Sequence, residues 1–212
     1  MLSSGHPITS MPLYYVADVW HVGSFDAADK NTHGSSQEGT GLSVSECPDD
    51  WCSIVKLGGH PTWHLTRPGA AFLDYHEMTQ VHRNAIIEWG IAKGYLEMRS
   101  KFKLSYLDSE YDETRFQLLD SREDAETEAA DLEDASIEEV SVPDATEAMS
   151  ARLRFKADAI AAEDFVATFY VEDETDLDGV WWHDTYDPAS LSAPRGVIVL
   201  RALPSWQRQL SN

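Results

Sequence analysis

The feature that most constrains this chain is the uneven distribution of its acidic residues. Residues 105–178 contain 24 Asp and Glu against 5 Lys and Arg, whereas residues 1–104 contain 11 against 8 and residues 179–212 contain 2 against 3. Charged side chains are costly to bury without partners, so the middle segment must leave most of its surface in solvent. We therefore predict that the two flanking segments form the central sheet and that residues 105–178 form an acidic elaboration of it.

The rest of the composition is that of an ordinary globular chain. With 212 residues, of which 42% are hydrophobic, the chain can bury a core without a disulfide framework or a structural metal. No apolar run approaches the roughly 20 residues of a membrane span, and the N-terminus lacks the pattern of a signal peptide. We expect a cytoplasmic protein that does not enter membranes, with residues 1–12 disordered and residues 13–212 forming a single domain.

Local patterns predict a strand-rich body in the flanking segments. Residues 24–41 are too polar to pack and indicate a loop, and Thr79 is a suitable cap for a helix that ends near Gly94. Pro48 and the two aspartates after it favour a short helix over residues 48–57. The strands are expected at residues 13–23, 41–45, 61–65, 70–75 and 197–200.

The acidic segment predicts both hairpin and helical structure. Residues 101–107 and 114–120 pattern as a hairpin, Ser121 caps a helix that runs to Asp134, and residues 137–142 form a strand that Pro143 ends. Helices are expected over residues 144–155 and 157–170, with a loop over residues 172–178. The expected fold class is α+β, with a mixed or antiparallel central sheet.

Several function classes lack their signatures in this chain. No G-x-G-x-x-G, Walker loop, G-x-S-x-G or H-E-x-x-H occurs. Lys and Arg are too few and too scattered for a nucleic-acid groove, and the acidic segment repels both nucleic acid and membranes. We expect no direct nucleic-acid binding.

The histidines and cysteines do not complete a metal site. Cys47 and Cys52 have a C-x4-C spacing with no second pair, which favours buried thiols. The remaining candidate ligands do not close a set of four, so no metal is expected. These candidates are His60, His64, Asp74, His76 and His82.

The densest group of aromatic, charged and histidine side chains lies between residues 176 and 200. Two adjacent tryptophans follow an Asp-Gly step, and the group is either the edge of a core or the wall of a pocket. Its members are Trp181, Trp182, His183, Asp184, Tyr186, Asp187 and Arg195.

Three segments together resemble the ADP-ribosyltransferase-like domains of the diphtheria-toxin and polymerase type. They are Trp20-His21-Val22-Gly23-Ser24, Gly41-Leu42-Ser43-Val44-Ser45 and the late Asp178-Gly179-Val180-Trp181-Trp182-His183-Asp184. In that family an H-G-[ST]-like strand end contacts the adenosine ribose of NAD, and a second strand seats the nicotinamide. A late acidic residue steadies the positively charged ribose as nicotinamide leaves.

The resemblance implies specific roles for residues of this chain. His21 and Ser24 would contact the ribose, Ser43 and Ser45 would occupy the second-strand positions, and Asp184 would be the late acidic residue. Asp184 and His21 would be the catalytic residues. Trp181, Trp182 or Tyr186 would stack on the nicotinamide or adenine, and Arg195 would meet a phosphate. The chain departs from the family pattern at Val22, at Ser43 in place of an aromatic residue, and in lacking a late Glu.

The sequence supports a second hypothesis from a different class. A non-enzymatic acidic protein, such as a nucleic-acid mimic, an immunity protein or a counter-defence factor, would use residues 105–178 to bind a basic protein partner. A third hypothesis is a toxin or effector that uses this segment to control itself. Mimicry requires carboxylates on one continuous face, whereas an NAD site requires that His21, Ser43 and Asp184 converge.

Overall fold

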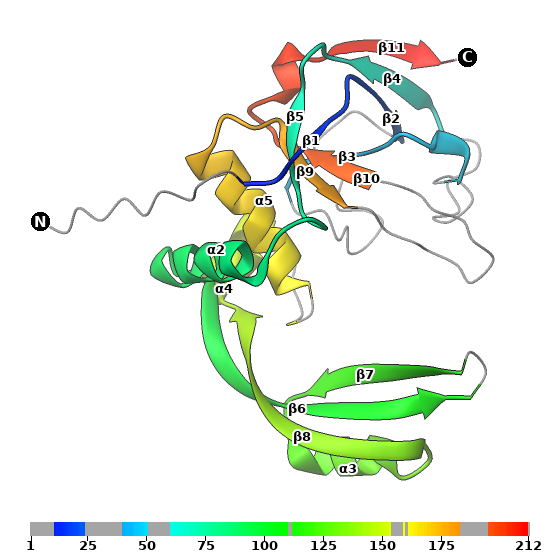
Figure 1. The fold of residues 1–212 in the computed structure, drawn as a ribbon, viewed down its shortest axis with the longest axis vertical. Helices are drawn as coiled ribbons and strands as arrows, with labels where there is room; N and C mark the ends of the chain where they lie inside the picture. Colours follow the sequence, from blue (N-terminus) through cyan, green and yellow to red (C-terminus); the bar gives the residue numbers. More distant parts are fainter. Residues whose placement is uncertain are drawn as a thin grey trace, which may run out of the picture.

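The computed structural model describes residues 11–23, 40–50, 60–109, 112–153, 159, 161–182 and 195–211. These residues form an eight-stranded mixed sheet, a separate three-stranded antiparallel sheet and several helices (Figure 1). The expected α+β class with a mixed central sheet is therefore confirmed.

The large sheet is built entirely from the two segments with little net charge. Its order is β1-β5-β9-β10-β3-β2-β4-β11, and every pairing is antiparallel except that of β5 with β9. The strands are β1 (Leu13–Tyr15), β2 (Asp18–Val22), β3 (Leu42–Ser45), β4 (Thr62–Thr66), β5 (Ala71–Asp74), β9 (Gly179–Trp182), β10 (Arg195–Ile198) and β11 (Gln207–Ser211).

The large sheet is strongly curved, so that strands far apart in its order contact each other on one face. We call this the inner face, and the face toward α5 the outer face. Tyr14 of β1 stacks on Trp181 of β9 and donates a hydrogen bond of 2.8 Å to Glu46, which follows β3. Phe72 of β5 contacts the ring of Trp206, beside β11, with ring centroids 6.1 Å apart. Because β1 and β3, or β5 and β11, are far apart in the sheet order, these contacts require strong curvature.

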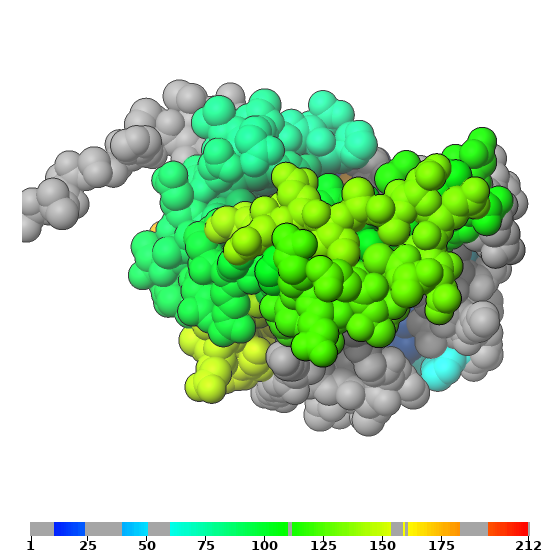
Figure 2. Space-filling view, turned by 90° about the horizontal axis from the view of Figure 1, so that it is seen from below, coloured from blue at the N-terminus to red at the C-terminus, as the bar shows by residue number. Residues whose placement is uncertain are grey.

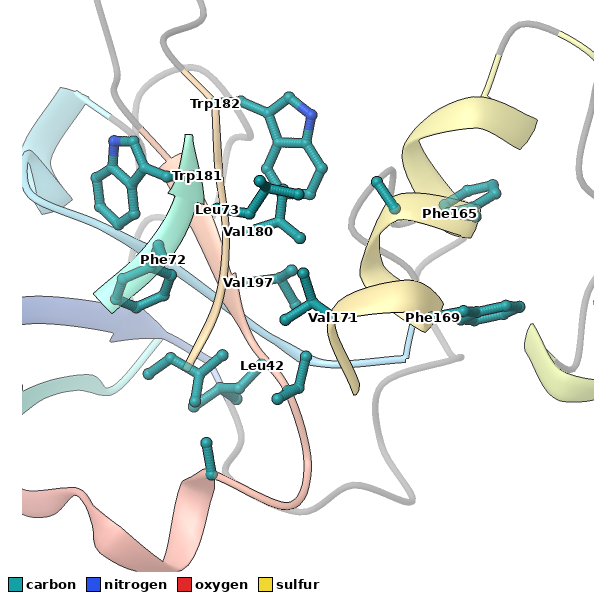
Figure 3. Packing of buried hydrophobic residues seen from close by; sticks show 14 of the residues in the cluster. Leu42, Phe72, Leu73, Phe165, Phe169, Val171, Val180, Trp181, Trp182 and Val197 are labelled. Carbon is teal, nitrogen blue, oxygen red and sulfur yellow. The ribbon is translucent and has the colours of Figure 1, made fainter. Parts of the chain in front are cut away.

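Helix α5 (Ala162–Glu174) covers part of the outer face. Val180, Val197 and Leu73 are directed toward it, whereas Trp181 and Phe72 lie on the other side of the sheet (Figure 3). Helix α2 (Gln80–Ala92) packs closely on α5, since a Cβ added at Gly90 would lie 2.5 Å from a side-chain atom of Val166. The shorter α4 (Glu147–Leu153) precedes α5, and η2 (Leu203–Ser205) is a single 3-10 turn.

The three-stranded sheet forms an arm, which we define as residues 96–145. Its strands β6 (Leu96–Asp108), β7 (Glu113–Leu119) and β8 (Glu133–Ala145) pair in the order β7-β6-β8, and α3 (Arg122–Ala129) packs against β6 and β8. Ala125 of α3 and Leu104 of β6 are both fully buried. The arm extends beneath the body (Figure 1) and, seen from below, lies in front of it (Figure 2). It carries 16 of the 37 Asp and Glu against 5 Lys and Arg.

Several predicted elements agree with the structure. Thr79 is the N-cap of α2, where its hydroxyl accepts from the His82 backbone amide, and the strands expected at residues 41–45, 61–65 and 70–75 correspond to β3, β4 and β5. The predicted hairpin corresponds to β6 and β7. Residues 1–10, most of the expected loop over 24–41 and most of the helix expected over 48–57 lie outside the described residues.

The single strand expected over residues 13–23 is wrong. The chain forms β1 and β2 with a break at Val16 and Ala17, because β1 pairs with β5 and β2 pairs with β4, near the opposite end of the sheet order. Val16 is buried in the core, and the Ala17 carbonyl accepts a hydrogen bond from the Arg67 amide. Within one continuous apolar run, the chain therefore passes from one part of the sheet to a distant part.

The predicted boundaries in the acidic segment also need correction. Helix α3 ends at Ala129 rather than Asp134, and β8 continues through Pro143 to Ala145. Pro143 is tolerated because β8 pairs only with β6 and lies at the edge of its sheet. Helix α4 begins only at residue 147, and α5 runs to Glu174 through the first residues of the predicted loop.

Candidate functional site

The described residues of the predicted NAD site lie on four neighbouring strands. Trp181 and Trp182 are in β9, Arg195 begins β10, Ser43 and Ser45 are in β3, and His21 is in β2, in the order β9-β10-β3-β2. Segments that are far apart in the sequence thus meet at one part of the sheet. The predicted site residues Ser24, Asp184 and Tyr186 lie outside the described residues.

Three of these side chains share one row of the outer face. Arg195 is opposite both Trp182 and Ser45, and Ser45 is opposite Trp20. Residues in register across strands point to the same face of a sheet. The Arg195 guanidinium lies 5.0 Å from the centre of the Trp182 ring, and the arginine is only 2% exposed.

His21 lies close to β3 but on the other face. Its Nδ1 donates a hydrogen bond of 2.8 Å to the backbone carbonyl of Ser43, which fixes the ring against the neighbouring strand. His21 directly follows Trp20, and consecutive side chains of a strand alternate between faces. The imidazole therefore lies on the inner side, opposite the row that contains Ser45 and Arg195.

The two tryptophans are core residues. Trp181 is fully buried on the inner face between Tyr14 and Phe72, with ring centroids 5.1 and 5.4 Å away. Trp182 is 4% exposed and packs between Tyr75, at 5.7 Å, and the Arg195 guanidinium. The expectation that one of these rings stacks on nicotinamide or adenine is not supported, because protein side chains are already packed against both rings.

Three buried polar atoms of these strands have no hydrogen-bond partner within the described part of the chain. They are the Ser43 hydroxyl oxygen and the indole nitrogens of Trp181 and Trp182. An unsatisfied buried donor costs about 1–3 kcal/mol, so three of them within one group of strands call for a physical explanation. In Figure 3 both indole nitrogens lie on the side of the ring nearer the C-terminal end of β9.

Tyr14 and Glu46 lie near the C-terminal end of β9 and were not among the predicted site residues. Burial raises the pKa of Tyr14 to about 12, with further contributions from its hydrogen bond to Glu46 and from the nearby Glu46, Asp74 and Cys47. Asp74 is opposite Trp181 in the pairing of β5 with β9. The sequence signal for Glu46 is its position directly after a predicted strand, but nothing in the sequence links it to Tyr14.

A second polar group surrounds a small hollow between α2, α5 and the end of β5. The Arg83 guanidinium lies 4.3 Å from the centre of the Tyr75 ring and donates to the Tyr75 carbonyl at 2.9 Å. Burial raises the pKa of Glu163, an effect that Arg83 partly offsets. The hollow has about 10 Å³ of space, which suits a single water molecule and excludes a nucleotide.

Two of the candidate metal ligands have structural roles. His64 stacks on Trp20 and hydrogen-bonds to Asp18 at 3.1 Å, and His82 completes the capping box of α2. Across the described ranges, no group of three or more His, Cys, Asp and Glu residues is placed to hold a metal ion. No helix in those ranges is both long and apolar enough to span a membrane.

Comparisons with protein-family models, with curated proteins and with solved structures found no match to this chain.

Proposed function

We propose that the protein binds NAD at the end of the large sheet formed by β9, β10, β3 and β2 and cleaves its nicotinamide–ribose bond. In this proposal the ADP-ribose unit is transferred to a macromolecular target, as in the ADP-ribosyltransferases that three segments of the chain resemble. The observation that carries the proposal is a set of buried atoms that lack a hydrogen-bond partner among the described residues, on the strands that hold the other predicted site residues. They are Ser43 Oγ and Trp182 Nε1 on the outer face of the sheet and Trp181 Nε1 on the inner face.

NAD supplies the groups that such a set of donors lacks. Its pyrophosphate is anionic, and its carboxamide and ribose oxygens accept hydrogen bonds. The Arg195 guanidinium, in the same row as Trp182 and Ser45, provides positive charge for a phosphate. Burial of these donors strengthens any bond that they form with a ligand, because the surrounding dielectric is low.

The chemistry assigns the remaining role to Asp184. When the bond between the ribose carbon and the pyridinium nitrogen breaks, its electron pair stays on nitrogen and neutral nicotinamide leaves. Positive charge develops on the ribose, and a fixed carboxylate stabilises it. A nucleophilic group of the target, or water, then bonds to the ribose carbon and loses its proton. Asp184 follows the last residue of β9 by two positions and is proposed as this carboxylate.

Titration with NAD while the indole N–H resonances are recorded by NMR tests the binding site. We expect the resonances of Trp181 and Trp182, assigned with Trp181→Phe and Trp182→Phe, to shift as their nitrogens gain acceptors. Trp89 and Trp206 serve as internal controls because their indoles already donate to Glu174 and Asp178. Saturating NAD that leaves the Trp181 and Trp182 resonances in place contradicts the proposed site.

The exposed Asp and Glu side chains of the arm favour a second candidate function, the binding of a basic protein partner. The acidic residues of α3 are all exposed, and the arm as a whole carries a large excess of negative charge. Such a field attracts a basic surface and accelerates its association at low ionic strength. This function is compatible with NAD chemistry in the body, since the two use different parts of the chain.

Charge neutralisation on the arm tests the second candidate. Replacing Glu123, Glu126 and Glu128 of α3 with Gln is expected to weaken binding of polylysine at low salt by about tenfold. Replacing Glu77, Glu88 and Glu147, which are exposed on the body, is the matched control and should have little effect. Equal losses in the two triple variants would show that the arm has no special role in binding.

A further inference from the structure

Strand β8 has the longest open edge among the strands that the structure describes. Four strands lie at the borders of the two sheets, and β8, with 13 residues, is longer than β7 with 7, β11 with 5 and β1 with 3. β8 pairs only with β6, and Figure 1 shows it along one border of the arm. Its register with β6 is regular from Ser136 to Ala145. We call the stretch from Ser136 to Val142 the β8 edge.

Pro143, directly after the β8 edge, shows which backbone groups point away from β6. A proline has no N–H group, so within a sheet its nitrogen faces the side without a neighbouring strand. Backbone groups of successive residues alternate between the two sides of a strand. Those of Ser141, Glu139 and Ile137 therefore point outward, as Pro143 does. Because no described strand pairs with this side of β8, their N–H and C=O groups can pair with an added strand.

The charge of β8 determines which strand fits beside it. β8 contains 5 Asp and Glu and no Lys or Arg, whereas β7 contains one acidic and one basic residue and β11 contains one Arg and no acidic residue. A second copy of β8 would place like charges opposite each other, which disfavours pairing between two copies of the chain. A basic strand places opposite charges across the pair instead.

The carboxylates of the β8 edge lie on both of its faces. Glu139 is opposite Phe102, whose ring lies 5.5 Å from the Arg122 guanidinium of α3, so Glu139 is on the face that α3 covers. Glu138 is opposite Lys103 and lies on the other face. Both glutamates are exposed. An added strand therefore meets a carboxylate on each face at neighbouring positions.

Neither glutamate forms an ion pair within the described part of the chain. Glu139 accepts a hydrogen bond from the Ser100 hydroxyl, which carries no charge. The ammonium of Lys103, on the same face as Glu138, lies 5.0 Å from the centre of the Phe116 ring on β7. The other cations of the arm pair with different carboxylates. The charge of both glutamates is thus open to a cation from outside the arm.

We propose that the β8 edge binds an extended basic segment of a protein partner by β-strand addition, with two adjacent Lys or Arg side chains beside Glu138 and Glu139. The outward backbone groups of Ile137, Glu139 and Ser141 pair with the added strand, and the two glutamates select its charge. The inference rests on the second candidate function, the binding of a basic partner by the arm, and states the surface and the mode of that binding.

Two substitutions of Ser141 separate backbone pairing from charge attraction. The probe is a peptide of about ten residues, rich in Val and Thr, with a central Lys-Lys pair. Ser141→Pro removes an outward N–H group without changing the charge, and is expected to weaken peptide binding by about tenfold. Ser141→Ala keeps this N–H group, is the matched control and should change the affinity by less than about twofold. Unfolding curves check that both variants are folded.

Hydrogen exchange of the backbone amides provides a second measurement, which needs no variant. Saturating Lys-Lys peptide is expected to slow exchange at Ile137, Glu139 and Ser141 by about tenfold or more, because their N–H groups gain acceptors. Attraction by charge alone leaves these amides open to water. The same peptide with a central Glu-Glu pair is the charge control, and we expect it not to bind.

Four results would overturn the inference: no binding of the Lys-Lys peptide, equal binding of the Glu-Glu peptide, unchanged exchange of the three amides, or equal affinities of folded Ser141→Pro and Ser141→Ala. The second candidate function is judged separately, by polylysine binding to the triple variants of α3 and of the body. If only the α3 variant loses polylysine binding while Ser141→Pro binds the peptide normally, the arm binds basic partners but not through the β8 edge. If the two triple variants lose equally while Ser141→Pro weakens peptide binding, the β8 edge stands without that function.

Discussion

Replacing Asp178 with alanine is expected to lower the free energy of unfolding by about 4 kcal/mol. Asp178 is 3% exposed and its carboxylate accepts from three donors: the Arg67 guanidinium, the Ala71 amide at 3.0 Å and the Trp206 indole at 3.3 Å. Its own backbone bonds to Ala71 and to Val199. One side chain thus joins the turn between β4 and β5, the start of β9 and the residue before β11.

The expected loss is large because alanine leaves all three donors without an acceptor. The indole of Trp206 and the amide of Ala71 would be left without their bonds in the interior, and Arg67 would lose its charge partner. Chemical denaturation of the variant measures the effect. Asp176→Ala, which removes an exposed carboxylate two residues earlier, is the matched control and should change stability by less than about 0.5 kcal/mol. A loss below about 1 kcal/mol for Asp178→Ala would contradict the bridging role.

Elements with a strong local signal could be predicted from the sequence. Helix α2 has a capping residue at Thr79 and an apolar spacing that only a helix satisfies, and the arm hairpin alternates apolar and polar residues. Local sequence patterns gave the wrong strand boundaries where the pairing of a strand with its neighbours decides where it begins and ends. Pro143 is compatible with β8 because that strand is at an edge, and the run from Leu13 to Val22 divides because its halves pair with different strands.

The arrangement of the candidate site residues could be predicted only in part for the same reason. The resemblance groups His21, Ser43 and the late tryptophans, and the strands that hold them lie within the run β9-β10-β3-β2 of the large sheet. It does not give the register that places His21 and Arg195 on opposite faces. It also does not give the curvature through which Tyr14 reaches Glu46, 32 residues away. Curvature and register depend on the whole sheet, which no short pattern encodes.

Asp184→Asn is expected to lower the rate of nicotinamide release from NAD by about 100-fold or more. The substitution keeps the size of the side chain and removes the charge that the proposal sets against the developing positive charge of the ribose. NAD binding should change little, because the carboxylate acts mainly in the transition state. Nicotinamide is measured by chromatography after incubation, and unfolding curves check that the variant is folded.

His21→Ala tests whether His21 positions the NAD site, in contrast to Asp184, which is proposed to stabilise the positive charge of the ribose. Its imidazole holds the carbonyl of Ser43, so its loss disturbs β3 beneath the ligand and is expected to weaken NAD binding as well as the rate. A folded Asp184→Asn variant that releases nicotinamide as fast as the unaltered protein would remove Asp184 from the catalytic role while leaving the binding site open to test.

The most direct test of the central claim is nicotinamide release from NAD by the unaltered protein, with and without cell extract as a source of macromolecular target. The account predicts time-dependent release that grows in the presence of the target and is lost in Asp184→Asn. If NAD is neither bound nor consumed under either condition, the four strands β9, β10, β3 and β2 do not form an NAD site, and the proposed function is wrong.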